Sequence, residues 1–209
     1  MFLTQFLTVT TITLLAVMSP GPDFAIVTRN SLKYSRNIGY ATSLGIALGL
    51  MIHITYSLVG IGLIISRSVV LFNIIKLIGA AYLAYIGLQA LRSKPNNIST
   101  ETPQQARSAE ITSLAAVKNG FFANALNPKA TIFFLALFTE VISPQTTLVV
   151  KLFFGGEIML IAFVWFSLLS YLMTRDGIKN RIIHVQHHVE HVMGAVLIAL
   201  GIKVALSTK

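Results

Sequence analysis

The chain has 209 residues, of which 55% are hydrophobic by type and 11% are charged. A soluble domain carries roughly 25% charged residues, so too few charges are present to cover a water-facing surface. The formal net charge is +9, yet the Lys and Arg residues lie between apolar runs and not in one stripe, which argues against a nucleic-acid partner. The composition therefore excludes an ordinary soluble domain and predicts a protein of the lipid bilayer.

Apolar segments near or above the length needed to cross a membrane, about 20 residues, recur along the chain. Six can be drawn, at residues 6–27, 38–65, 69–91, 121–142, 148–173 and 189–206. Backbone groups in hydrocarbon must be hydrogen-bonded within their own segment, and the alternating pattern of a membrane barrel is absent. We therefore predict an all-α polytopic membrane protein of about six transmembrane helices.

A polar stretch at residues 92–118 has the composition of a flexible linker. We expect one transmembrane domain, 1–209, in which this cytoplasmic linker joins a first three-helix half, 1–91, to a second, 119–209. An odd number of helices makes the second half enter the membrane in the opposite sense. The prediction is thus two inverted three-helix halves, an arrangement found in secondary transporters.

The basic residues between the spans predict the orientation of the chain. Connections one, three and five hold most of them: Arg29, Lys33, Arg36, Arg92, Lys94, Arg107, Lys118, Arg175, Lys179 and Arg181. The even connections and the C-terminal tail hold Arg67, Lys151 and Lys209. Because short cytoplasmic loops carry the excess of Lys and Arg, we expect both termini outside the cytoplasm.

The first span contains the string Ser19-Pro20-Gly21-Pro22-Asp23. Two prolines and a glycine within three positions remove two backbone donors and make a continuous helix improbable. The freed carbonyl groups need partners in a bundle interior or a wet cavity. A carboxylate at Asp23 is costly in lipid, so it is a candidate functional residue.

The fourth span contains a second interruption, Asn127-Pro128-Lys129. It lies in the first helix of the second half, as the first interruption lies in the first helix of the first half. Proline-interrupted segments in corresponding helices are the best sequence indication of a transporter binding site. The alternative is a pair of unrelated proline kinks, which membrane helices tolerate.

The two interruptions predict a shared pocket for a zwitterion. The helical segments that follow Pro22 and Pro128 are expected to begin at similar depth and to point away from each other. Their N-termini would then face one another and suit a carboxylate, because each carries unpaired N–H groups and about half a positive charge. Asp23 would receive an ammonium group, and Lys129 would assist the carboxylate or pair with Asp23 when the site is empty.

Four further polar residues lie within the spans, at His53, Lys76, Glu157 and Lys203, and the two lysines are near enough to span ends to reach the interface. Glu157 follows Gly155 and Gly156, whose missing side chains could admit a neighbour or water, and a carboxyl removed from water can hold a proton. Glu157 is therefore, with Asp23, a proton-coupling candidate, and its alternative is a hydrogen-bonded structural role. His53 is a lone histidine of the kind that usually hydrogen-bonds across helices.

Four histidines, at positions 184, 187, 188 and 191, have the spacing that places them on one helix face. Histidines four residues apart can bind zinc, but polar residues are also expected where a helix enters the membrane. We predict no metal site; metal binding or pH sensing is the alternative to a solvated face.

The sequence contains no H-E-x-x-H, G-x-S-x-G or P-loop motif. The seven acidic residues are too scattered to indicate a hydrolytic carboxylate pair. We therefore predict that the chain is not an enzyme and needs no cofactor.

At Ser19–Asp23 and Asn127-Pro128-Lys129-Ala130 the chain resembles the LysE/RhtB family of bacterial amino-acid exporters. The resemblance extends over the whole length, including Gly79-Ala80-Ala81-Tyr82-Leu83-Ala84-Tyr85-Ile86-Gly87 and the closing run 194–201. It implies proton-driven efflux of amino acids or close derivatives across the inner membrane.

The leading hypothesis is a secondary transporter whose interrupted helices bind an amino acid while the halves rock around it. The predicted binding residues are Pro20, Gly21, Pro22, Asp23, Asn127, Pro128 and Lys129. The alternatives are a channel or passive pore and a non-catalytic membrane scaffold. Small residues at helical spacing also permit a homodimer.

Overall fold

The structure is a computed structural model that describes residues 2–67, 69–92, 111–140, 146–175 and 179–206. Within these ranges every regular element is an α-helix. In chain order they are α1 (Phe2–Met18), α2 (Pro22–Lys33), α3 (Arg36–Arg67), α4 (Val69–Arg92), α5 (Ser113–Ala125), α6 (Pro128–Glu140), α7 (Leu148–Met173) and α8 (Lys179–Leu206). The predicted all-α polytopic membrane class is confirmed.

Two described helical stretches are long and apolar enough to cross a membrane, Arg36–Leu58 within α3 and Leu148–Met173, which is α7. A third is formed by α1 and α2 if they are taken as one span that bends by 56°. Residues His191–Leu206 of α8 form a shorter apolar helix. The long apolar runs of the sequence therefore become long helices, and the runs with prolines become pairs of short ones.

Both predicted interruptions are present. The first lies between Met18 and Pro22, where Gly21 is extended and Pro22 occupies the first turn of α2. The second lies between Ala125 and Pro128. A proline lacks the N–H that would continue the preceding helix but fits the first turn of the next one. Each break is therefore encoded locally by its proline.

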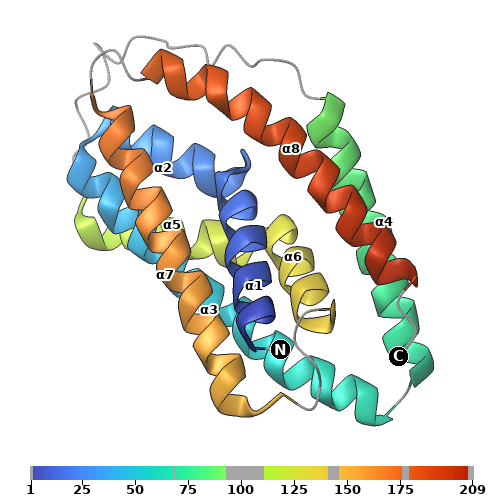
Figure 1. The fold of residues 1–209 in the computed structure, drawn as a ribbon. Helices are drawn as coiled ribbons and strands as arrows, with labels where there is room; N and C mark the ends of the chain where they lie inside the picture. The colour runs from blue at the N-terminus through green and yellow to red at the C-terminus, as the bar shows by residue number, and fades with distance from the viewer. Residues whose placement is uncertain (1, 68, 93–110, 141–145, 176–178, 207–209) are drawn as a thin grey trace.

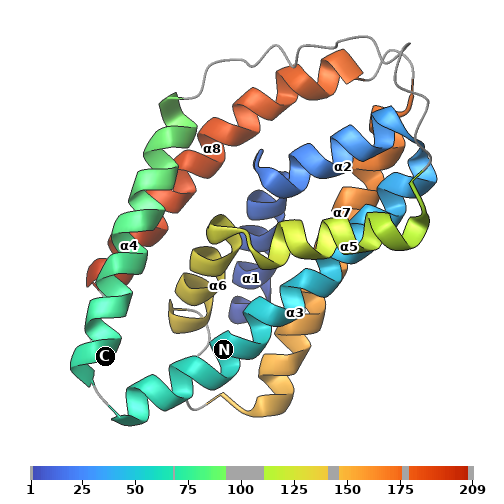
Figure 2. The same cartoon turned by 180° about the vertical axis from the view of Figure 1, so that it is seen from behind.

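The helices form two groups with one helix of each broken pair between them. Figures 1 and 2 both show α4 and α8 side by side along one edge of the molecule, while α3, α5 and α7 form the opposite side. Helices α1 and α6 lie between these groups (Figure 1). Two clusters of buried apolar residues follow this division, one centred on α3, α6 and α7 and a smaller one between α4 and α8. The interior site described below lies where they meet.

Helices α3 and α5 approach each other so closely that glycine is required at the crossing. A Cβ atom on Gly45 would collide with the carbonyl oxygen of Val117, and one on Gly120 would collide with that of Thr42. Small residues allow such backbone contact in membrane bundles. This crossing fixes the position of α5 and therefore of the second break.

The polar ends of several helices meet at one end of the bundle. Arg36 at the start of α3 donates from Nε to Thr174 Oγ1 at 2.9 Å, just beyond α7. The guanidinium groups of Arg36 and Arg175 both lie 4.6 Å from the centre of the Tyr171 ring. The first residues of α1 and the last of α8 lie toward the opposite end (Figures 1 and 2). The helix ends beside the first and fifth predicted connections thus lie together, and their side of the membrane stays a prediction.

Candidate functional site

The interior pocket lies at the two breaks and is lined by residues from all eight described helices and the segments between them. They are Thr13, Ala16, Val17, Ser19, Gly21, Asp23, Phe24, Ile46, Leu50, Leu83, Ile86, Asn124, Asn127, Lys129, Ala130, Phe133, Phe134, Ile158, Ala162, Phe166, Met193 and Leu197. Most of the lining is apolar, and the polar side chains are concentrated at the breaks. Pockets of this composition are typical of small-molecule sites.

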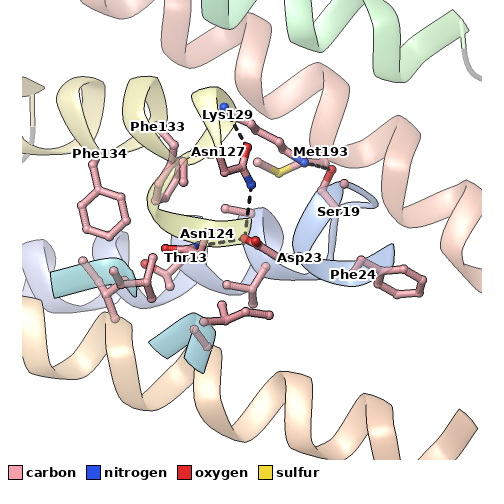
Figure 3. Close-up of a pocket in the computed structure, with 18 of the residues that line it drawn as sticks. Thr13, Ser19, Asp23, Phe24, Asn124, Asn127, Lys129, Phe133, Phe134 and Met193 are labelled. Atoms are coloured by element: carbon pink, nitrogen blue, oxygen red, sulfur yellow. Dashed lines mark hydrogen bonds between the residues drawn. The ribbon is translucent and has the colours of Figure 1, made fainter. Parts of the chain in front are cut away.

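Asp23 lies in the first turn of α2 and faces the second break (Figure 3). Its Oδ2 atom accepts a hydrogen bond from Asn124 Nδ2 at 2.8 Å and one from Asn127 Nδ2 at 3.3 Å. Its Oδ1 atom is buried and has no hydrogen-bond partner among the described residues. One oxygen of the carboxylate is therefore held by the protein, and the other is available to a bound cation.

Lys129 lies in the first turn of α6, and its side chain extends to the first break. Its Nζ atom donates to Ser19 Oγ at 2.8 Å and to the carbonyl oxygen of Pro20 at 3.1 Å. That carbonyl is one of the backbone groups released by the prolines, so the lysine satisfies a polar group that the interrupted helix exposes. The Lys129 charge also acts electrostatically on Asp23.

The remaining residues of the two motifs shape the breaks. Asn127 accepts a hydrogen bond from the backbone N–H of Lys129 at 3.0 Å through Oδ1, which caps the start of α6. Gly21 packs against the lysine, since a Cβ atom there would lie 3.6 Å from Lys129 Nζ, which is an ordinary van der Waals contact. Pro20 contributes its carbonyl, while Pro22 and Pro128 begin the two short helices. The structure thus brings all seven predicted binding residues to one region.

Glu157 lies one residue before the lining residue Ile158 on α7, and is not itself part of the pocket lining. Its Oε1 atom accepts a short hydrogen bond from Thr10 on α1. Its Oε2 atom is buried and has no hydrogen-bond partner among the described residues. Glu157 therefore links α7 to α1 through Thr10, which lies about one helical turn before Thr13.

The four histidines lie on α8, where the side chains of His184 and His187 fall outside the described residues. The side chain of His188 is exposed, and that of His191 is partly buried. Among the described side chains no group of three or more potential metal ligands occurs. The solvated and metal-binding interpretations of this face both stay open.

Sequence reasoning did not assign Asn124, Ser19 or Thr13 to the site. Asn124 lies three residues before Asn127 and carries the shorter of the two bonds to Asp23. A buried amide in an apolar span is a signal that could have found it, since polar side chains inside membrane helices seek partners. Thr13 is fully buried, and its hydroxyl has no hydrogen-bond partner among the described residues.

The pocket, with opposite charges on two broken helices, is the arrangement expected of a solute transporter. The sequence profile of the LysE type translocator family matches residues 14–208. The chain belongs to this family. Both breaks and every lining residue of the translocator except Thr13 fall inside the matched region.

Two of the following three curated relatives cover nearly the whole translocator. A threonine efflux protein of Escherichia coli strain K12 is 28% identical over 97% of this chain and 98% of its own length. An uncharacterized membrane protein of Bacillus subtilis is 29% identical over 91% of this chain and 93% of its own length. A homoserine/homoserine lactone efflux protein of Salmonella typhi is 36% identical over 61% of this chain and 60% of its own length. No solved structure is significantly similar to the translocator.

Proposed function

We propose that the chain is a secondary active exporter of amino acids or close derivatives across the bacterial inner membrane, coupled to protons. The printed names of two relatives, threonine efflux and homoserine/homoserine lactone efflux, support the substrate class and the direction of transport. The apolar helices and the family membership support a location in the membrane.

The observation that carries the proposal is the meeting of Asp23 and Lys129 in one largely apolar pocket. They come from different breaks, 106 positions apart by their residue numbers. An amino-acid backbone carries one ammonium and one carboxylate group, so a site with one charge of each sign matches it. In this proposal Asp23 Oδ1 accepts the substrate ammonium, while Lys129 and the N-termini of α2 and α6 bind its carboxylate.

The rest of the pocket supports a substrate with a small uncharged side chain. Asp23 and Lys129 are the charged residues among those that line it. Because the substrate backbone would use both, the described lining offers no third charge for a charged side chain. The buried hydroxyl of Thr13 has no partner among the described residues, and it would bind a hydroxyl on the substrate. A buried polar group left unpaired costs about 1–3 kcal/mol, so its pairing favours a hydroxylated substrate over an apolar one.

We further propose that residues 1–91 and 119–209 act as two inverted halves that rock around this pocket, joined by the linker at 92–118. Both termini would lie outside the cytoplasm. In that arrangement each half contributes one broken helix to the site, α1–α2 from the first and α5–α6 from the second, with the start of α5 at Ser113 lying within the predicted linker. A single substrate would then contact both halves, which links binding to their relative movement.

Asp23 and Glu157 are the two candidates to carry the coupled proton. Asp23 would bind either a proton or the substrate ammonium, which is a direct form of exchange. Glu157 would couple through the α1–α7 contact that it makes with Thr10. The variants Glu157→Gln and Asp23→Asn distinguish these two candidates.

The test of the function is efflux of labelled threonine, homoserine and lysine from preloaded cells that overproduce the protein, with and without a protonophore. We expect faster efflux of threonine and homoserine, no effect on lysine, and loss of the effect with the protonophore. Asp23→Asn and Lys129→Ala should each abolish the increase, whereas Lys118→Ala, at an exposed position of α5, should retain it.

Three outcomes would contradict the proposal. Full activity in both site variants would remove the pocket from the mechanism. Ion conductance without proton coupling would indicate a channel. No flux of any loaded amino acid, together with indifference to Asp23→Asn, would indicate a scaffold. Membrane insertion of each variant is checked by immunoblotting of the membrane fraction.

A further inference from the structure

His53 on α3 is fully buried and lies next to the second break. Its Nε2 atom is 2.9 Å from the carbonyl oxygen of Asn124, which is near the end of α5. Its Nδ1 atom is 2.9 Å from the hydroxyl of Tyr56, one turn further along α3. The Tyr56 hydroxyl in turn donates to the carbonyl oxygen of Thr131 on α6, at 3.1 Å. This network connects α3 to the chain on both sides of the break.

Each of the three contacts in this network needs one hydrogen to be a hydrogen bond. A carbonyl oxygen only accepts, so the bond to Asn124 requires a hydrogen on Nε2. A tyrosine hydroxyl has one hydrogen, and the bond to Thr131 uses it. The contact between Nδ1 and the same hydroxyl then requires a second hydrogen on the ring. The three contacts are all hydrogen bonds only when His53 is an imidazolium.

The neutral ring gives a different arrangement of the same atoms. Nε2 keeps its hydrogen and its bond to Asn124, because that oxygen cannot donate. Nδ1 becomes an acceptor, so the Tyr56 hydroxyl turns toward it and releases Thr131. The two arrangements differ by one proton at Nδ1 and by one rotation of a hydroxyl group. Burial disfavours the charged ring, whereas the additional bond to Thr131 favours it.

The groups around His53 connect it to the substrate site. Asn124 bonds to His53 through its backbone and to Asp23 through its side chain. On α6, Phe134 stacks on the imidazole with ring centres 5.6 Å apart and also lines the pocket. Tyr56 contacts the ring directly. On the neighbouring helices, Asp23 of α2 and Lys129 of α6 line the same pocket as Asn124 and Phe134, Glu157 lies on α7, and Lys118 of α5 is exposed.

We infer that His53 is a proton switch that positions the second broken helix. With a proton on Nδ1, the Tyr56 hydroxyl holds Thr131, and α3 is tied to both α5 and α6. Without it, α6 is released from Tyr56 while α5 stays bound. The protonation state of His53 therefore determines whether α3 is hydrogen-bonded to both α5 and α6 or to α5 alone. Because α6 carries Lys129 and α5 carries Asn124, this changes the support of the two sides of the pocket. The proton is exchanged with solvent, and its effect on substrate affinity rests on the proposed function.

The first experiment measures directly which ring nitrogens of His53 carry a hydrogen, and it does not depend on transport activity. The chain contains five histidines, so His→Gln at positions 184, 187, 188 and 191 leaves His53 as the sole imidazole. Solid-state 15N NMR of this variant in lipid is recorded from about pH 5 to about pH 9, the range in which histidines usually titrate. We expect hydrogens on both ring nitrogens at low pH, and on Nε2 alone at high pH. A ring that stays in one state, or a neutral ring protonated on Nδ1, would overturn the switch.

The second experiment measures the consequence for the site with threonine as the probe. We expect the affinity of the purified protein for threonine to change with pH by about fivefold or more, the lower range of ordinary coupling between sites. His53→Gln can donate to Asn124 but cannot become charged, and Tyr56→Phe removes the rotating hydroxyl. Each should remove the contribution of His53 to the pH dependence and leave only that of Asp23, while retaining threonine binding.

The matched control is Tyr85→Phe, which removes a hydroxyl that accepts a hydrogen bond from Gln89 on the exposed side of α4. It should leave the pH profile unchanged. A profile that is the same in both His53→Gln and Tyr56→Phe as in the unmodified protein would overturn the link between the switch and the pocket. If the unmodified protein bound no threonine at any pH, the proposed function would fail, and the NMR result would still decide the switch.

Discussion

Asn124 donates its side-chain amide to the Asp23 carboxylate at 2.8 Å, although the two residues are 101 positions apart in the sequence. The contact joins the second break to the first and leaves one carboxylate oxygen without a partner among the described residues. The same residue accepts from His53 through its backbone carbonyl when Nε2 carries a hydrogen. Asn124 is therefore the point at which the substrate site meets the His53 network.

Replacing Asn124 by Ala should weaken transport without removing either charge from the pocket. It leaves Asp23 with the longer bond to Asn127, and loss of a bond to a buried charged group costs about 1.5–3 kcal/mol. We expect threonine efflux to fall roughly tenfold or more. The control is Asn119→Ala, at an exposed position on the same helix. Equal efflux in both variants would show that the Asn124 contact does not position Asp23.

Replacing Thr13 by Val should change substrate preference. The two side chains have similar shape, so the substitution removes the buried hydroxyl and leaves the packing. Loss of a hydrogen bond to a substrate hydroxyl is worth about 1 kcal/mol. Competition assays should show threonine weakened several-fold relative to valine, and Thr11→Val, at an exposed position of α1, should leave the ratio unchanged. A preserved ratio in Thr13→Val would place the substrate side chain elsewhere.

Glu157→Gln and Asp23→Asn should separate the two proton-coupling candidates. A transporter that has lost its proton-carrying group can still exchange labelled for unlabelled substrate, because exchange moves no net proton. If Glu157 carries the proton, Glu157→Gln in proteoliposomes keeps threonine exchange but no longer responds to an imposed pH gradient. Loss of exchange together with gradient-driven transport would instead indicate a structural role through the Thr10 contact. Asp23→Asn should lose both, since Asp23 is also the proposed acceptor of the substrate ammonium.

Gly45→Ala should destabilise the protein, whereas Gly156→Ala should not. A Cβ atom on Gly45 collides with backbone of α5, while one on Gly156 meets nothing within 4 Å. Overpacking of a tight contact costs about 1–3 kcal/mol, and Ala otherwise favours a helix over Gly by about 1 kcal/mol. Thermal unfolding of the purified proteins in detergent should show a lower midpoint for Gly45→Ala only. Equal midpoints would mean that α3 and α5 separate without cost.

The sequence by itself determined the class of the protein and the places where its helices break. The apolar runs must be helical because hydrocarbon offers no partner for a backbone group. The breaks at Pro22 and Pro128 follow from the missing N–H of proline, which acts on its own helix and needs no tertiary contact. The expectation that Asp23, Asn127 and Lys129 lie close together came from the same local argument, combined with the direction of each span.

The tertiary structure decided which atoms meet. Lys129 donates hydrogen bonds to Ser19 and to the Pro20 carbonyl, in addition to its electrostatic effect on Asp23. These hydrogen bonds depend on how α6 lies against the first break. The partnership of Asp23 with Asn124 depends on the close crossing of α3 and α5, where glycines let the backbones touch. Side-chain contacts between distant helices depend on crossing angle and rotation about each helix axis. Composition and spacing within one helix do not determine either, so the hydrogen-bond partners of Asn124 and of His53 emerged only from the packed molecule.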